Sequence, residues 1–193
     1  MKPIRICRLV GLCLLAMFGL SVFPCAVIAA DVTLFGGIQH AGNITVDTGS
    51  SGLIGQIKEF DAKTFGVIGG RYAHGKLLGG EYTAQYSPNF ITSDSHAWMF
   101  HGNLRVQIPD LLVIRPYATA GFGLVNSSGN PTTSFGTEPL FNYGGGINLS
   151  LGLVRLNLDV RGYTIPNPQI PGVTVKNNIN FIQPSIGLVF PLP

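Results

Sequence analysis

Cysteine is scarce in this chain and is confined to its first 25 residues, as Cys7, Cys13 and Cys25. The rest of the chain therefore has no thiol, which excludes disulfides, cysteine metal ligands and cysteine-based catalysis there. Charged residues are also few, at 11% of the 193 residues against 46% hydrophobic. This balance is unusual for a water-soluble domain of this size, so we expect that something other than water solvates part of its surface.

Long apolar runs are absent as well, except over residues 9–22. The run is preceded by three basic residues, Lys2, Arg5 and Arg8, and is followed by Pro24. The small residues Val27, Ala29 and Ala30 then lead up to the polar Asp31. This order predicts a secretory signal peptide over residues 1–30, cleaved after Ala29 or Ala30, and a single domain over residues 31–193.

Two other interpretations of the leader fit less well. An uncleaved membrane anchor would need a longer apolar segment. A lipoprotein signal would need small residues before its cysteine, whereas Phe23 and Pro24 precede Cys25. The leader holds three of the twelve basic residues and none of the nine acidic ones, so the net charge of +3 falls to zero without it. The overall charge therefore gives no indication of nucleic-acid binding.

Helical periodicity is missing after residue 31, and alternation of period two takes its place. The clearest stretches are residues 98–108, 154–161 and 182–190, and weaker ones cover residues 32–40, 65–74, 78–87, 114–125 and 141–151. The expected strands number eight, each near the roughly 9–11 residues that a tilted strand needs to cross a bilayer. On their apolar faces we expect seven lipid-facing residues: Trp98, Phe100, Leu104, Val106, Leu156, Leu158 and Val160.

The connections between these stretches alternate in length. We expect long loops over residues 41–64, 88–95, 126–139 and 164–178, and tight turns at Gly75, at Pro109 and Asp110, and near Gly152. Barrels of bacterial outer membranes have short periplasmic turns and longer extracellular loops. In lipid an open sheet edge would leave backbone groups unpaired, so the sheet has to close. The sequence therefore predicts an all-β fold, an eight-stranded antiparallel up-and-down transmembrane β-barrel that follows a cleaved signal peptide.

Glycines are numerous, and many fall inside the predicted strands, where they relieve crowding in a narrow barrel. The polar faces of these strands point inward and carry a predicted cluster of Glu81, Arg105, Arg155, Asp159 and Arg161, to which Arg71 or Arg115 could be added. Enclosed charges must be paired, hydrogen-bonded or hydrated. We expect them to fill and plug the lumen, since the interior of an eight-stranded barrel is only wide enough for side chains. A narrow pore lined by the same groups is the alternative.

Motifs for other chemistry are incomplete. Residues 70–76 have the spacing of a phosphate-binding loop, but Leu77 replaces its Ser or Thr and no helix is expected to follow. The four histidines, His40, His74, His96 and His101, do not share a metal-ligand spacing. Asp94, Ser95 and His96 are neighbours, whereas the members of a catalytic triad are brought together in space. We therefore expect no metal and no cofactor.

Three segments resemble successive strands of the OmpA-like, OmpX-type family of small outer-membrane β-barrels: residues 115–123, 143–147 and 156–163. The resemblance covers roughly residues 31–190. The closing strand is similar to the assembly signal of that class, with Ile186, Leu188 and Phe190 alternating, although residues 191–193 extend beyond the aromatic residue. The resemblance implies a barrel-only member, placed in the bacterial outer membrane by the barrel assembly machinery.

Members of that family share a fold rather than one activity. We expect a monomeric structural or surface-interaction barrel, not an enzyme, that contacts outer-membrane lipid, binds no nucleic acid and offers four polar loops to an extracellular ligand. A lipid-modifying enzyme is the alternative, but the His-x-Ser pair of the deacylase type is absent. A soluble lipocalin-like carrier would need a polar outer face, which residues such as Trp98 and Leu158 argue against.

Overall fold

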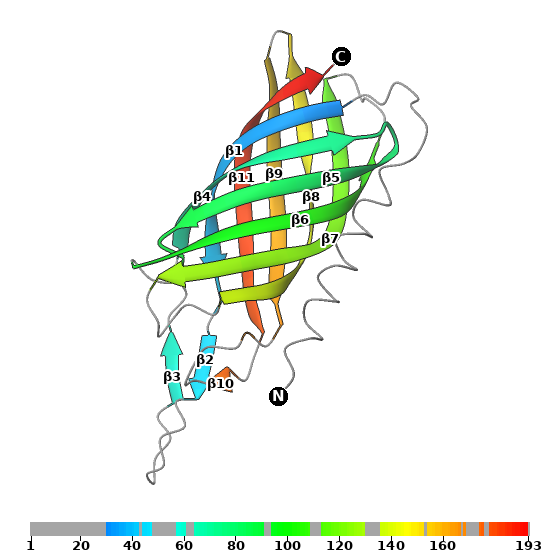
Figure 1. Cartoon of the computed structure of the whole chain (residues 1–193). Coiled ribbons are helices and arrows are strands. Elements are labelled where there is room, and N and C mark those ends of the chain that lie inside the picture. The colour runs from blue at the N-terminus through cyan, green and yellow to red at the C-terminus, as the bar shows by residue number, and fades with distance from the viewer. Residues whose placement is uncertain are drawn as a thin grey trace.

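Eight long strands form one closed antiparallel barrel in the computed structural model of the chain (Figure 1). They are β1 (Ala30–Ala41), β4 (Thr64–His74), β5 (Leu78–Pro88), β6 (Ser95–Gln107), β7 (Ile114–Gly129), β8 (Gly136–Leu151), β9 (Val154–Ile165) and β11 (Ile179–Leu192). The structure describes residues 30–42, 44–47, 57–60, 64–90, 94–108, 113–129, 136–152, 154–166, 168, 174–175 and 178–192. The predicted leader lies outside these residues, apart from Ala30.

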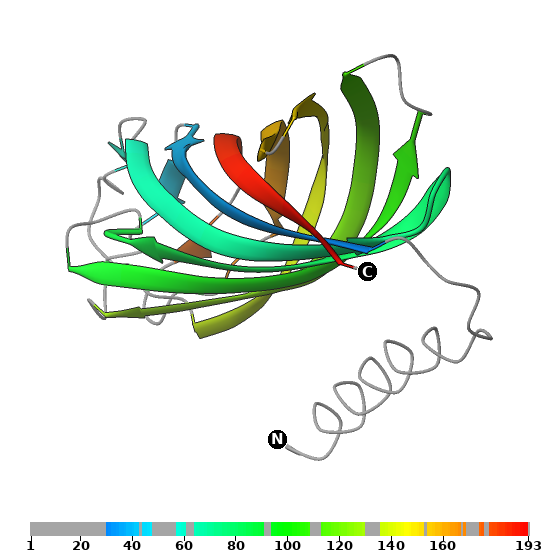
Figure 2. The ribbon, with the colours of Figure 1, turned by 90° about the horizontal axis from the view of Figure 1, so that it is seen from above.

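Each barrel strand pairs with its neighbours in the chain, and β1 closes the ring against β11, with Ala30 opposite Leu192. The strands curve around a common interior (Figure 2). This is the up-and-down topology expected from the sequence, and all eight predicted strands are present. The predicted fold class is therefore confirmed. Among the described residues, no helix is long and apolar enough to cross a membrane.

The connections differ from the prediction in two places. The expected long loop over residues 126–139 is mostly strand, because β7 continues to Gly129 and β8 begins at Gly136, with Asn126 opposite Thr137. The expected tight turn at Pro109 covers residues 108–113, as long a connection as that between β5 and β6. The amide of Ile108 still donates to the carbonyl of Pro116, but Pro109 has no amide hydrogen with which to continue the ladder.

The outer face of the barrel is apolar, whereas its inner face is largely polar. Large hydrophobic side chains are exposed on every barrel strand, for example Ile186 at 57% and Leu104 at 60%. In the described barrel strands, by contrast, the side chains of Asp, Glu, Lys and Arg all occur at positions of the inner face, and none of them is classed as exposed. Charge on an outer face at membrane depth is costly. This inside-out distribution, in a closed sheet, is that of a transmembrane β-barrel of the bacterial outer membrane.

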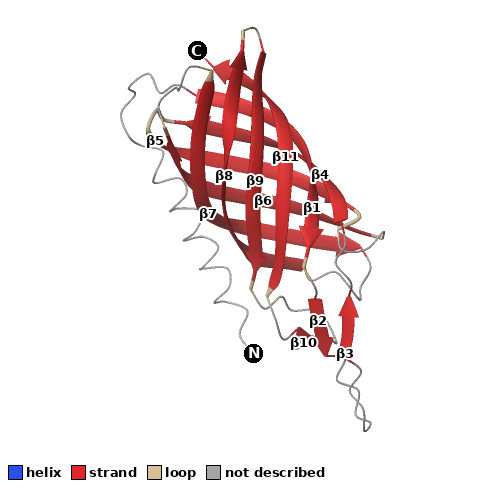
Figure 3. Ribbon diagram, turned by 180° about the vertical axis from the view of Figure 1, so that it is seen from behind, coloured by secondary structure: helices blue, strands red, loops and turns tan. Residues whose placement is uncertain are grey.

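A second, smaller sheet extends the end of the barrel that carries the longest connections (Figure 3). It consists of β10 (Thr174–Val175), β2 (Ile44–Asp47) and β3 (Ile57–Phe60), in that order. β2 and β3 come from the connection between β1 and β4, and β10 comes from the connection between β9 and β11. We call this end of the barrel the long-loop end and the opposite end the short-turn end; β1 begins and β11 ends at the short-turn end.

Candidate functional site in the barrel lumen

Glu81 is at the centre of a buried charge network in the lumen. It projects inward from β5 and is completely buried. Its Oε1 lies 2.7 Å from Nη1 of Arg161 and 3.6 Å from Nε of Arg71, and its Oε2 accepts a hydrogen bond of 3.2 Å from Nη1 of Arg105. Asn103 donates a further bond of 3.0 Å to Oε1. One carboxylate therefore draws together arginines from β4, β6 and β9.

Asp159 on β9 is the second carboxylate of the network. Arg161 contacts it with two nitrogens, Nε at 2.8 Å from Oδ1 and Nη2 at 3.2 Å from Oδ2. Nη2 of Arg71 lies 3.3 Å from Oδ1, and the hydroxyl of Tyr117 donates to Oδ2 at 2.5 Å. Arg71 and Arg161 therefore bridge both acids, which ties β4, β5, β7 and β9 across the barrel.

The network contains three arginines and two carboxylates, so it carries one uncompensated positive charge. Polar and aromatic groups surround it. Arg71 donates to Oδ1 of Asn157 at 3.1 Å and lies 4.7 Å above the ring of Phe35. Arg105 lies 3.8 Å from the centre of the Tyr117 ring. Cation–π contacts of this kind gain strength when water is excluded. These contacts to side chains of the barrel strands hold the arginines of the network in place.

Arg155, one of the predicted members of the lumen cluster, lies apart from this network. Arg155 lies near the short-turn end and pairs with Asp31 at 3.0 Å, where both side chains are partly exposed. Arg71, which the sequence offered as a further member of the cluster, lies in the network and is 2% exposed. Alternation predicts which face of a strand a residue occupies, but it does not predict how far along the barrel axis that residue lies. Arg155 is therefore on the inner face but too far along the axis to reach the network. Glu81, Arg105, Asp159 and Arg161 do lie together.

A layer of side-chain amides lies next to the charge network, toward the long-loop end. Gln183 on β11 accepts bonds from Gln39 at 2.6 Å and Gln85 at 3.1 Å, and donates one to Gln85 at 3.1 Å. Ser87 donates to Gln39 at 2.8 Å. These groups come from β1, β5 and β11 and are all nearly inaccessible to solvent. Because each amide both donates and accepts, the layer fills the lumen with satisfied polar groups.

The long-loop end of the lumen is closed by an apolar cluster that the sequence reasoning missed. It includes Ala41, Phe65, Phe90, Ala97, Met99, Val125, Leu140, Tyr163, Ile165, Ile179 and Phe181. Phe90 follows β5 in a short connection, where Asn89 has a φ of 58°, and its ring packs edge-on against Phe65 at 5.1 Å. The Phe90 amide donates to the Ser95 carbonyl, and the Ser95 hydroxyl bonds back to the carbonyl of Phe90. This connection therefore inserts its aromatic ring into the mouth of the barrel.

The lumen is thus filled by three layers in sequence: paired charges, amides and an apolar cluster. The sequence signal that could have revealed the third layer is a change from polar to apolar residues at inward positions near the strand ends. There, inward positions such as Phe65, Leu140 and Phe181 are apolar although they alternate with outward ones. In the part of the chain that the structure describes, no group of three or more His, Cys, Asp or Glu residues is arranged to hold a metal ion.

The residues predicted to face lipid lie on the outer face. Trp98, Phe100, Leu104, Val106, Leu158 and Val160 are 39–60% exposed, and Leu156 is half-buried between its neighbours. Tyr86 packs against Trp98, and Trp98 stacks on Phe100. The three positions of the predicted assembly signal, Ile186, Leu188 and Phe190, also point outward along β11.

Comparison with known proteins identifies the fold. No family model and no curated protein matches the chain. Among solved structures, it is similar to Neisserial surface protein A, with a TM-score of 0.60 and 14% identity over 83% of this chain and 95% of that one. It is also similar to the N-terminal β-barrel domain of OprF from Pseudomonas aeruginosa, with a TM-score of 0.52 and 11% identity over 84% and 97%. The chain therefore has the fold of the small outer-membrane β-barrels.

The expectation that the chain is not an enzyme has to be corrected. The outer membrane enzyme PagL is among the matching structures, with a TM-score of 0.47 and 15% identity over 84% of this chain and 99% of that one. The missing His-x-Ser pair counts only against the deacylase type and does not exclude enzymes as a class.

Proposed function

We propose that this chain is a non-conducting surface barrel of the outer membrane that acts through its long-loop end. The single observation that carries the proposal is the burial of side chains from all three layers of the lumen: Glu81, Arg161, Gln183 and Phe90 are each at most 1% exposed. We infer that a lumen packed in this way leaves no aqueous path through the barrel. Its accessible features are then the outer wall, the short turns and the long-loop end, where the small sheet projects.

The long strands β7 and β8, together with the small sheet, support a role in surface interaction. β7 and β8 are 16 residues long, well beyond the roughly 9–11 residues that span a bilayer. Outward side chains near their loop-proximal ends are polar, and Asn126 donates to Thr137 at 2.8 Å. The loop-proximal ends of these strands and the small sheet therefore extend beyond the length that a bilayer needs, and a ligand or partner can reach them there.

We also propose that the chain is related to the OmpA-like barrels and that it reaches the outer membrane by export and assembly. The segments at residues 115–123, 143–147 and 156–163 support an OmpA-like protein. We propose that residues 1–30 are removed on export, that the chain remains a monomer, and that the barrel assembly machinery recognises Ile186, Leu188 and Phe190 on β11. Pro191 and Leu192 continue the pairing of β11 with Asp31 and Ala30, which supports a closing strand that accommodates the extra residues.

Planar-bilayer recording of the refolded barrel tests the central claim. We expect no stepwise conductance under voltages at which open porins conduct, because paired charges, amides and the apolar cluster block the lumen in series. Heat-modifiable gel migration of the same sample serves as the folding control. Steady conductance from protein that passes this control would overturn the proposal in favour of a narrow pore.

A further inference from the structure

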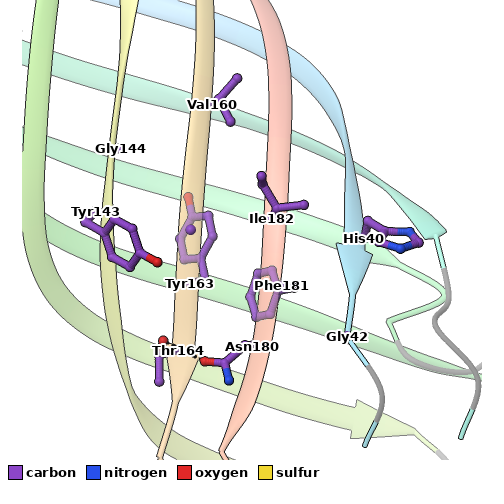
Figure 4. Close-up of a pocket in the computed structure, with 11 residues that line it drawn as sticks. His40, Gly42, Tyr143, Gly144, Val160, Tyr163, Thr164, Asn180, Phe181 and Ile182 are labelled. Atoms are coloured by element: carbon purple, nitrogen blue, oxygen red, sulfur yellow. Dashed lines mark hydrogen bonds between the residues drawn. The ribbon is translucent and has the colours of Figure 1, made fainter.

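The outer wall of the barrel has a groove near the long-loop end, formed by β8, β9, β11 and β1 (Figure 4). Its volume is about 480 Å³, within the range of roughly 300–1,000 Å³ of small-molecule sites. One row of paired residues crosses it, with Tyr143 opposite Gly162, Gly162 opposite Ile182 and Ile182 opposite His40. These positions alternate with lumen positions, so the groove opens to the outside.

Gly162 forms the floor of this groove. A Cβ atom at this position would lie 2.9 Å from Cζ and 3.1 Å from the hydroxyl of Tyr143, so the Tyr143 ring leans across the bare backbone of β9. Val160 and Ile182, both 49% exposed, line the part that extends away from the loops. Apolar side chains therefore line this part of the groove, and they suit a hydrocarbon chain.

The end of the groove nearest the loops is polar. Thr164 donates to Oδ1 of Asn180 at 2.8 Å, and Nδ1 of His40 lies 2.9 Å from the hydroxyl of Thr64. All four side chains project from the outer face of the barrel. The amide nitrogen of Asn180 and the ring of His40 are positioned to bond a carbonyl or hydroxyl oxygen. The polar groups therefore lie at the membrane-surface end and the apolar groups lie deeper.

We propose that this groove binds one acyl chain of the glycolipid of the outer leaflet, with the ester or amide carbonyl of that chain near Asn180 and Thr164. The occupant follows from position, because lipid is what surrounds this wall. The leaflet follows from the long-loop end, which faces outward in barrels of this class. The inference uses the membrane orientation of the proposed function but depends neither on a silent lumen nor on a loop ligand.

Lipid A binding to the refolded full chain in detergent micelles tests the site, with bound lipid counted by mass spectrometry of the intact complex. Gly162→Leu places a side chain on the floor of the groove, where its Cβ meets the end of the flexible Tyr143 side chain. We expect wild type to retain one lipid A and Gly162→Leu to bind at least tenfold more weakly. Gly70→Leu is the matched control, since Gly70 also faces outward and its added Cβ would lie 3.8 Å from Leu34; it should bind as wild type does.

A second pair of variants separates binding from misfolding. Ile182→Trp fills the groove from β11 and should reproduce the loss if Gly162→Leu does not fold. Thr164→Val with Asn180→Leu keeps the shape but removes the polar end, and should weaken binding several-fold. Heat-modifiable migration reports folding for each variant. Equal binding by folded wild type and groove-filled variants, or an equal loss in Gly70→Leu, would overturn the proposal, whereas conductance in planar bilayers would overturn only the proposed function.

Discussion

At the scale of single residues, Glu81 connects three arginines in the lumen. Its carboxylate lies within 3.6 Å of nitrogens from three arginines, all at most 5% exposed. Removing one partner of a buried ion pair typically costs about 3–5 kcal/mol, because the remaining charge is left uncompensated. We expect Glu81→Ala to lower the free energy of unfolding by an amount of this order, and water to enter the lumen beside the arginines.

Urea unfolding in lipid vesicles and planar-bilayer recording measure these two effects. Arg155→Ala is the control, because Arg155 and Asp31 form a pair whose side chains are 25% and 18% exposed. Ion pairs at the surface contribute only about 0–1 kcal/mol, so Arg155→Ala should change stability little and stay silent in the bilayer. Equal effects of the two variants would contradict the central role assigned to Glu81.

The outer face provides a second prediction at this scale. Leu158 is 39% exposed and lies between two buried lumen residues, Asn157 and Asp159. Leu158→Arg places a charge toward lipid, which costs about 2–4 kcal/mol near the bilayer midplane. Folding yield in vesicles should therefore fall, whereas Leu158→Val should fold normally. Normal folding of the arginine variant would mean that Leu158 lies at a polar interface rather than in the hydrocarbon.

At the scale of elements, alternation located all eight barrel strands, because a closed wall between lipid and lumen imposes two different faces on each of them. Alternation failed to predict the structure where the two faces of a strand carry residues of the same polarity. Near Asn126 and Thr137 polar side chains appear on either side of β7 and β8, so these strand ends have the composition of a loop. Phe65 and Phe181 face the lumen although they are apolar, so a rule that assigns polar residues inward misses the cluster at the mouth.

Glycines on the inner faces of β7 and β8 show what alternation cannot measure, namely the distance between strands. A Cβ on Gly146 would lie 2.3 Å from the carbonyl oxygen of Leu158 and 2.8 Å from the Tyr117 hydroxyl. We expect Gly146→Ala to destabilise the barrel by about 1–3 kcal/mol through overpacking. Gly66→Ala is the matched control, because its added Cβ meets nothing within 4 Å. Urea titration of both variants measures the difference, and equal midpoints would contradict the close packing.

At the scale of the whole molecule, the predicted leader, residues 1–30, ends where β1 begins. Ala30 pairs with both Leu192 and His74 and is 8% exposed. We expect the mature protein from outer membranes to begin at Ala30 or Asp31, since signal peptidase cuts after a small-residue stretch. N-terminal sequencing distinguishes these starts. A protein that begins at Met1 in that membrane fraction would contradict the cleaved leader.

The orientation of the barrel gives the final prediction. In the sequence, Lys63 lies between β3 and β4, and Lys176 between β10 and β11, in the two connections that also provide the small sheet. Lys76 is exposed in the turn between β4 and β5, at the opposite end. Since longer loops face the exterior in this class, trypsin added to intact cells should cut after Lys63 and Lys176 and leave Lys76 uncut.

Mass spectrometry of the new termini identifies the cut sites. Permeabilising the outer membrane provides the control, because periplasmic access should add a cut after Lys76 while the arginines buried in the lumen stay protected. If trypsin cut at Lys76 in intact cells and left Lys63 and Lys176 uncut, the barrel would have the opposite orientation in the membrane. The polar end of the wall groove would then lie in the inner leaflet, and the glycolipid assigned to that groove could not reach it.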